Sequence, residues 1–256
     1  MLESLKLSLL ITRKHWAVYR KSFFSNILPT VTDPIFYLFS IGMGVGAYVI
    51  ELGGHEYVSY IAPGLIASAA LWTSFFETSY NFYIRLSYDG SYKAMMTTPI
   101  GPKEIIFGEL LWVGIKGAGM CLGVCLVVFA LLRQFDVIFL FSITLLGALL
   151  GFTCGALGLL ATSFVKNINQ FQTIYALLIS PLFFFSGTFF PIKDLSPLAQ
   201  KLALLNPLYY GIEIAQALYW KKDIADTLSL FLPLLILSGL VLGFFAYRRI
   251  YRLLYK

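Results

Sequence analysis

The chain has 256 residues, of which 59% are hydrophobic and only 12% are charged. Soluble domains carry about twice that share of charge, and a water-soluble chain of this length has too little interior for so many apolar side chains, so the composition excludes a soluble enzyme and predicts an integral membrane protein. The net charge of +6 does not indicate nucleic-acid binding, because the basic residues lie beside apolar segments and form no single stripe.

Residues 1–28 form the first predicted element, an amphipathic helix. Apolar side chains, among them Leu5, Leu9 and Trp16, gather on one side of a helical wheel, and lysine and arginine flank them. This pattern is typical of a helix that lies in the headgroup plane of a membrane.

Six apolar segments follow, at about residues 29–49, 57–83, 105–132, 137–165, 170–187 and 227–247. A helix needs about 20 apolar residues to cross the hydrocarbon core, and the last segment contains no charged residue at all. No internal repeat or low-complexity linker divides the chain. We therefore expect one all-α membrane domain over residues 1–256, with six transmembrane helices and an N-terminal interfacial helix.

Residues 188–226, between the fifth and sixth predicted spans, are rich in aromatic side chains but broken by Pro191, Pro197 and Pro207. Irregular backbone at membrane depth is tolerated only where protein buries it or where it lines a cavity. We predict a re-entrant hairpin of two short helices that enters from the outer face. The alternative is an extracellular loop with interfacial aromatic residues.

The distribution of basic residues predicts the orientation of the chain. With the N-terminus in the cytoplasm, the cytoplasmic segments hold thirteen lysine and arginine residues and the outer segments hold five. Cytoplasmic loops of membrane proteins carry an excess of these residues. Both termini are therefore expected on the cytoplasmic side of the inner membrane.

Residues 85–104 form a polar loop between the second and third spans. Gly90 can start a short helix, residues 91–97 can continue it, and Pro99 can end it. Tyr92, Met95 and Met96 then share one face, and flexible methionine side chains suit docking onto another protein. An ordinary interfacial helix remains the alternative interpretation.

Three charged residues, Glu77, Glu109 and Lys116, fall inside predicted spans. A charge at the bilayer centre is unfavourable by roughly 2.5–3.5 kcal/mol on insertion scales, so each such residue needs an explanation. They can line a polar path or sense a coupling proton. They can also pair with one another across the bundle, which is the structural alternative.

Motifs of soluble chemistry are missing from the sequence. There is no GxxxxGK[ST] phosphate loop for ATP, no HExxH and no GxSxG. Cys121 and Cys125 share a helical face but have no histidine or acidic residue near them in the sequence, so we interpret them as small buried residues and expect no metal site. The two histidines, His15 and His55, are predicted on opposite sides of the membrane.

Two stretches carry a resemblance to a known family. Residues 60–112, which include TSFFETSYNFYIRLSYDGSYKAMMTTPIGPKEIIFGELLW, resemble the permeases of nodulation-factor (lipo-chitooligosaccharide) exporters. Residues 180–213, SPLFFFSGTFFPIKDLSPLAQKLALLNPLYYGIE, are similar to the signature of type-2 ABC exporter permeases in general.

The resemblance implies roles that the residues alone do not give. The loop helix becomes the coupling helix that seats on a separate ATP-binding subunit, a role that would fall on Gly90, Ser91, Tyr92, Lys93, Ala94, Met95, Met96 and Thr97. The N-terminal helix near residues 14–20 would contact the same subunit. The outer re-entrant hairpin would include Ser186, Gly187, Pro191, Asn206, Pro207 and Leu208.

The resemblance also implies an assembly of two copies of this chain with two ATPases, which hold ATP and magnesium, so that no cofactor is expected in this chain. The implied cargo is an amphiphile, such as a glycolipid or a lipid-linked oligosaccharide, exported across the inner membrane. Two other classes compete with this hypothesis. One is an ATP-independent secondary transporter or channel, and the other is an intramembrane transferase, for which we find no polar constellation at one depth.

Overall fold

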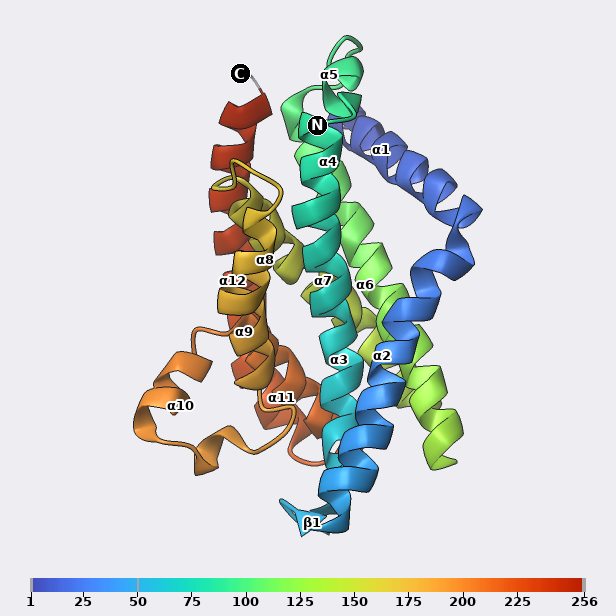
Figure 1. The fold of residues 1–256 in the computed structure, drawn as a ribbon, viewed down its shortest axis with the longest axis vertical. Helices are drawn as coiled ribbons and strands as arrows, with labels where there is room; N and C mark the ends of the chain where they lie inside the picture. Colours follow the sequence, from blue (N-terminus) through green and yellow to red (C-terminus); the bar gives the residue numbers. More distant parts are fainter. Residues whose placement is uncertain (1, 50, 255–256) are drawn as a thin grey trace.

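The structure is a computed structural model that describes residues 2–49 and 51–254. The chain forms a helical bundle elongated along one axis (Figure 1). Both ends of the chain and helix α5 (Ser91–Met95) lie at one end of the bundle, named here the terminal end. The opposite end is named the hairpin end, after the short antiparallel hairpin of β1 (Glu51–Leu52) and β2 (His55–Glu56).

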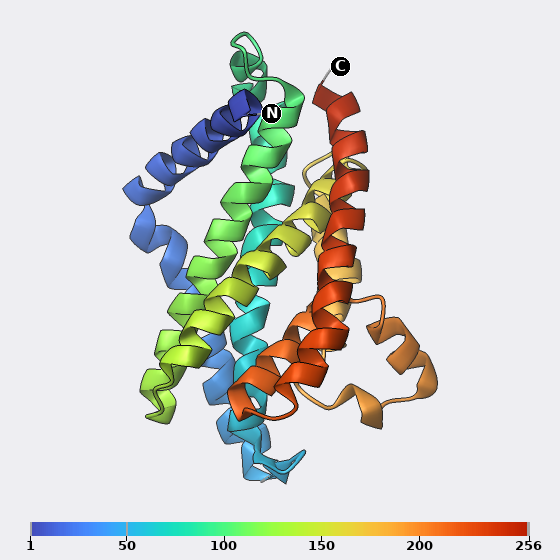
Figure 2. The ribbon, with the colours of Figure 1, turned by 180° about the vertical axis from the view of Figure 1, so that it is seen from behind.

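Helix α1 (Leu2–Lys21) runs obliquely along α6 (Pro102–Leu132) at the terminal end (Figures 1 and 2). Its buried side carries Ile11 and three polar side chains, Ser8, Thr12 and His15, whereas Leu5 and Trp16 are about half exposed. The apolar side of the helix therefore faces outward, as expected of a helix at a membrane surface. Helix α2 (Phe23–Gly44) and a 3₁₀ turn, η1 (Val45–Ala47), continue toward the hairpin end.

Four helical segments are long and apolar enough to cross a membrane, and they confirm an all-α membrane protein. They are Tyr57–Ser87, α6, α7 (Val137–Thr162) and α12 (Ile224–Leu254). The first combines α3 (Tyr57–Phe76), a π-helical turn η2 (Glu77–Asn81) and α4 (Phe82–Ser87). The other two predicted spans coincide with shorter apolar stretches, Ile35–Ala47 and Gln170–Phe184.

The stretch Gln170–Phe184 is itself composite, with α8 (Gln170–Ile174), a π-helical turn η3 (Tyr175–Ile179) and α9 (Ser180–Phe184).

Lys256, which contributes to the charge balance that predicts the orientation, lies outside the described residues. The basic residues Arg248 and Arg252 stand on the last turns of α12 at the terminal end.

Helices α6 and α7 cross closely because glycines remove the side chains at their contact. A Cβ atom on Gly117 would lie 2.6 Å from the carbonyl oxygen of Gly147, and one on Gly151 would lie 2.5 Å from the carbonyl oxygen of Val113. Small residues allow such approaches between membrane helices, where packing replaces the hydrophobic effect as the attraction. Helix α3 is buried along this pair, whereas α12 exposes apolar side chains such as Leu237 and Phe244.

Residues 185–226 contain another 3₁₀ turn, η4 (Ile192–Asp194), and helices α10 (Pro197–Ala203) and α11 (Pro207–Trp220). Helix α11 packs against α3, α7 and α12, while α10 stands away from the bundle (Figures 1 and 2). The amide of Asn206 ties this segment to α9, since its Nδ2 donates to the carbonyl oxygen of Leu182 at 2.6 Å. Its Oδ1 caps α11 by accepting from the Leu208 N–H at 3.0 Å.

The tight turn that precedes η4 is also fixed by buried contacts. Ser186 is fully buried and its hydroxyl lies 2.9 Å from that of Thr188, whose Cα packs against Gly64 of α3. Gly187 adopts a φ of +89°, which favours glycine. Pro191 then leads into η4. These buried contacts therefore anchor the segment in the bundle.

Candidate functional site

A continuous network of polar side chains lies inside the terminal end of the bundle. The group, named here the charge network, brings together side chains from α1, η2, α4, α5 and α6. Its members are His15, Glu77, Arg85, Tyr92, Glu109 and Lys116.

Glu109 of α6 is the point where three other elements meet. Its carboxylate is completely buried. The Tyr92 hydroxyl donates to its Oε1 at 2.6 Å, and Nε2 of His15 lies 2.7 Å from the same oxygen. Arg85 Nη2 donates to its other oxygen at 2.9 Å. One carboxylate therefore joins α1, α4 and α5 to α6.

Arg85 of α4 links both carboxylates of the network. Its Nη1 donates to Glu77 at 2.8 Å and its Nη2 to Glu109 at 2.9 Å, while its Nε donates to the Tyr92 hydroxyl at 2.8 Å. A planar guanidinium offers several donors in a rigid fork, which suits simultaneous contact with two carboxylates. This geometry fixes the relative positions of α4, α5 and α6.

Glu77 opens the π-helical turn η2, and its second oxygen accepts from Lys116 Nζ at 2.7 Å. Asn81, one turn later, donates to the same oxygen at 3.1 Å. A π-helical turn inside an α-helix displaces the side chains that follow it, and such turns are frequent at functional sites. Here the turn brings Glu77 and Arg85 to the same side of the continuous helix Tyr57–Ser87.

The formal charges of the network balance, because two carboxylates face the basic side chains of Arg85 and Lys116. Buried ion pairs add little net stability compared with apolar replacements, since desolvation offsets their attraction. Removing one partner is different, because it leaves an uncompensated buried charge at a cost of about 3–5 kcal/mol. The network therefore fixes geometry more than it adds stability.

Helix α1 is held to the same place by contacts around His15. Its imidazole stacks on Trp112 with ring centroids 5.8 Å apart. The Thr12 hydroxyl donates to the Gly108 carbonyl at 3.2 Å, and the absent side chain of Gly108 leaves the room that Ile11 occupies. Helices α1 and α5 are thus connected through Glu109.

Helix α5 starts at Gly90, whose φ of +63° is in the left-handed region. Tyr92 points inward and is fully buried, and Met95 and Met96 are partly buried against the core of the terminal end. The exposed tip of this segment is formed by other side chains, namely Lys93, Ala94, Thr97 and Thr98.

These positions correct one expectation from the sequence. The amphipathic face of Tyr92, Met95 and Met96 was expected to dock onto another protein, and for Tyr92 this is wrong because the chain's own core covers its side chain. Substitutions of Met95 and Met96 would also disturb this core. The surface that α5 offers to a partner is its exposed tip, and its role in coupling stays a prediction.

The structure brings together the three charged residues that the sequence placed inside spans, and it adds Arg85, Tyr92 and His15 to them. Glu109 and Lys116 do not pair with each other but with residues of other elements. Arg85 was assigned to a loop because the second span was expected to end at residue 83, whereas the helix continues to Ser87. The spacing of Glu77, Asn81 and Arg85 at i, i+4 and i+8 was the available signal.

Comparison with known proteins gives the family of this chain. A family model described as "ABC-2 type transporter" matches residues 6–220. The chain belongs to the ABC-2 type transporter family. The match covers most of α1, the whole charge network and the helices through α11, and it ends before α12.

Individual relatives agree with the ABC-2 assignment. Nodulation protein J of Rhizobium leguminosarum bv. viciae is 28% identical over 218 residues, which cover 85% of this chain and 84% of the relative. Nodulation protein J of Bradyrhizobium diazoefficiens is 26% identical over 244 residues, covering 94% and 91%. The inner membrane transport permease YadH of Escherichia coli is 22% identical over 188 residues, covering 73% and 72%.

These matches confirm the resemblance to type-2 ABC exporter permeases that the sequence indicated. As an ABC-2 family member with several apolar helices, the chain is a multi-pass membrane permease of an ABC transporter. The family implies an ATP-binding partner and makes this chain a transport subunit.

Proposed function

We propose that this chain is the membrane-spanning subunit of an ATP-driven exporter and that its α5 tip docks on a separate ATP-binding subunit. The observation that carries the proposal is the charge network, which joins α5 to α1, α4 and α6 through buried contacts. A displacement of α5 by a partner would be passed directly to helices that are long enough to span the membrane.

The arrangement of the ends supports a six-span topology. Both termini and α5 lie at one end, as an even number of crossings requires (Figure 1). We propose that α2 and the stretch Gln170–Phe184 complete the six spans, and that residues 188–226 form the outer re-entrant segment. The excess of basic residues at the terminal end supports a cytoplasmic position for it, by the positive-inside rule.

The working unit that we propose contains two copies of this chain and two ATPases, with ATP and magnesium bound on the ATPases alone. Closure of the ATPases would push the two α5 tips, and the permeases would part toward the outer side. The proposed cargo is an amphiphile with a glycan part and a lipid part. Support for this cargo comes from the resemblance of residues 60–112 to the permeases of nodulation-factor (lipo-chitooligosaccharide) exporters.

The test is reconstitution of the chain with its ATPase. The two proteins are purified together and placed in proteoliposomes, and ATP-dependent movement of a fluorescently acylated chito-oligosaccharide is measured. The informative variant is Ala94→Asp, since Ala94 is exposed on the α5 tip and a new charge there would be buried in the contact. An unpaired charge at such an interface should reduce co-purified ATPase at least tenfold.

Ala225→Asp is the matched control, because Ala225 is also exposed on a helix but lies at the start of α12, near the hairpin end. It should leave co-purification and transport unchanged. Transport by the chain without any ATPase would contradict the proposal and favour a secondary transporter or channel. Normal ATPase binding by Ala94→Asp would show that the α5 tip is not the docking surface.

A further inference from the structure

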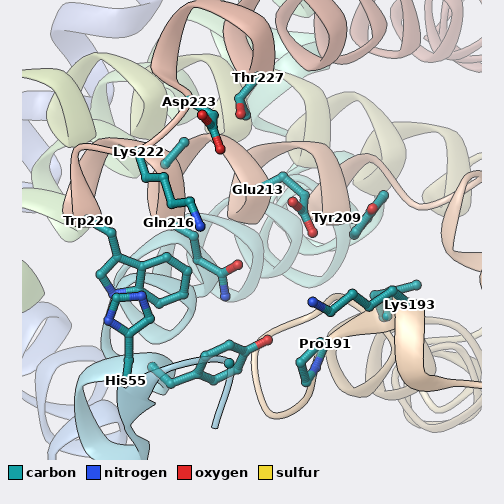
Figure 3. A pocket seen from close by; sticks show the side chains of 14 residues that line it. His55, Pro191, Lys193, Tyr209, Glu213, Gln216, Trp220, Lys222, Asp223 and Thr227 are labelled. Carbon is teal, nitrogen blue, oxygen red and sulfur yellow. The ribbon is translucent and has the colours of Figure 1, made fainter.

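A second polar site, separate from the charge network, lies at the hairpin end. It is a pocket with a volume of about 390 Å³, named here the outer pocket, and Figure 3 shows it from close by. This volume falls in the range of roughly 300–1,000 Å³ that is typical of small-molecule sites. Its walls come from the β-hairpin, α3, residues 191–193, α11 and the beginning of α12.

One face of α11 supplies most of the polar wall. Tyr209, Glu213, Gln216 and Trp220 follow one another at spacings of four, three and four residues, so they share a side of the helix. In Figure 3 they face the hollow between α11 and the segments that carry His55 and Pro191. The opposite side of α11 is buried in the apolar core.

The floor of the outer pocket is held by hydrogen bonds. Gln216 is 93% buried, and its Nε2 donates to the Gly187 carbonyl at 3.3 Å. The Tyr60 hydroxyl donates to the same carbonyl at 3.3 Å. Gly187 belongs to the fixed turn at residues 186–188, so these polar groups are pre-positioned and need no rearrangement to meet a ligand.

Aromatic rings form a continuous wall beside these groups. The imidazole of His55 stacks on the indole of Trp220 with centroids 4.2 Å apart and an angle of 8° between the planes. Tyr60 lies 5.6 Å from the same indole. Among the described residues, the buried Nε1 of Trp220 has no hydrogen-bond acceptor. Such a wall offers flat apolar faces and a polar donor to the same ligand.

Four charged side chains surround the opening, and their charges cancel. Lys193 and Lys222 provide two positive charges, and Glu213 and Asp223 provide two negative ones. In the part of the chain that the structure describes, none of the four belongs to an ion pair. A phosphate or another strong anion would meet repulsion from both carboxylates. A hydroxyl group suits all four, because it donates to carboxylates and accepts from ammonium groups.

We propose that the outer pocket binds a neutral saccharide. Hydroxyl groups on the rim of a sugar ring pair with donors and acceptors of both charges, and the C–H faces of the ring pack on aromatic side chains. The outer pocket combines both kinds of surface in one volume. Saccharide binding by the outer pocket is independent of the proposed function. The further statement that this saccharide is the glycan part of the exported cargo rests on the proposed function.

The experiment measures binding to the full chain in lipid nanodiscs by isothermal titration calorimetry. The probes are chitotetraose and maltotetraose as neutral saccharides, and inorganic phosphate as an anion. We expect a saccharide to bind and phosphate not to bind. Glu213→Gln and Lys222→Gln should each weaken saccharide binding about tenfold, the effect of losing one hydrogen bond to a charged group.

Lys201→Gln is the matched control, because Lys201 is exposed on α10 and does not line the outer pocket. It should bind saccharide as the unmodified chain does. The proposal is overturned by a folded chain that binds neither saccharide, by phosphate binding instead, or by unchanged affinity in both pocket variants. These failures are distinct from failure of the proposed function, because the assay requires neither an ATPase nor transport.

Discussion

At the terminal end, the carboxylate of Glu109 receives hydrogen bonds or ion pairs from three other elements, whereas the carboxylate of Glu213 at the hairpin end joins no ion pair among the described residues. The charge network is closed and its formal charges balance through direct contacts. In the outer pocket Tyr209 hydrogen-bonds the carboxyl group of Glu213, but the four charged side chains form no ion pair among the described residues, and the pocket opens to the surface. Paired charges of this kind position helices, and unpaired ones remain available to a ligand.

The most damaging substitution expected from this comparison is Glu109→Ala. It would leave Arg85 and His15 without their shared partner inside the bundle, at a cost of about 3–5 kcal/mol. The free energy of unfolding, measured by denaturant titration in detergent, should fall by this amount. Glu109→Gln keeps an acceptor for Tyr92 and should lose less. Unchanged stability of Glu109→Ala would show that the network does not fix the helices.

A smaller effect is expected for Lys116→Leu, because Glu77 would still pair with Arg85. We expect a loss of about 1–3 kcal/mol from the incompletely paired carboxylate. The double variant Glu77→Gln/Lys116→Leu removes one charge of each sign and should recover much of the loss. The coupling energy of this double-mutant cycle should reach about 0.5–3 kcal/mol. Strict additivity of the two substitutions would contradict the pairing.

The surface ion pair of Lys221 and Asp136 should contribute less to stability than the buried pairs of the charge network. Lys221 Nζ lies 2.7 Å from Asp136, and this hydrogen bond holds the pKa of the Asp136 carboxyl below its ordinary value. Asp136→Asn keeps the cap on the Ile138 and Phe139 N–H groups but removes the ion pair, so only about 0.2–1 kcal/mol should be lost.

This stabilisation depends on pH in a defined direction. Because the pKa of Asp136 is lowered in the folded chain, its contribution is present above the ordinary carboxyl pKa. It is lost as the pH falls through the lowered value. The difference in unfolding free energy between the parent and Asp136→Asn should therefore shrink in acid. A difference that grows in acid would contradict the pairing.

The smallest effect on folding is expected in the outer pocket. Lys222→Gln should change the free energy of unfolding by less than about 0.5 kcal/mol, since Lys222 is exposed and forms no ion pair among the described residues. The same denaturant titration measures it. If Lys222→Gln lowered the free energy of unfolding as much as Lys116→Leu, the side chains of the outer pocket would contribute to folding as those of the charge network do, which would contradict the comparison.

The sequence was sufficient for the membrane class, for the positions of the long spans and for the short helix near residues 91–97, which the structure places at Ser91–Met95. These features follow from local patterns, such as continuous apolar segments and a glycine before a helix. The sequence did not show which protein surface covers the apolar face of that helix. An amphipathic side with Tyr92 and Met95 looks the same whether the chain's own core or another protein buries it.

The pairings of the charge network could not be predicted because they depend on how distant elements pack. His15 and Glu109 are 94 positions apart, and Glu77 and Lys116 are 39 apart. Arg85 was missed for a local reason, since the helix continues through α4 to Ser87, beyond the expected end of the apolar segment at residue 83. The outer pocket was missed entirely, because its residues come from five separate segments.

Site-specific photo-crosslinking in cells tests most directly whether the terminal end is where the ATPase binds. A benzoylphenylalanine is placed at Thr97, which is exposed on the α5 tip, or at Ala225 near the hairpin end. We expect a crosslink to a phosphate-loop ATPase from residue 97 and none from residue 225. A crosslink to the ATPase from residue 225, or its absence from residue 97 in cells where the two proteins co-purify, would contradict docking of the ATPase at the terminal end.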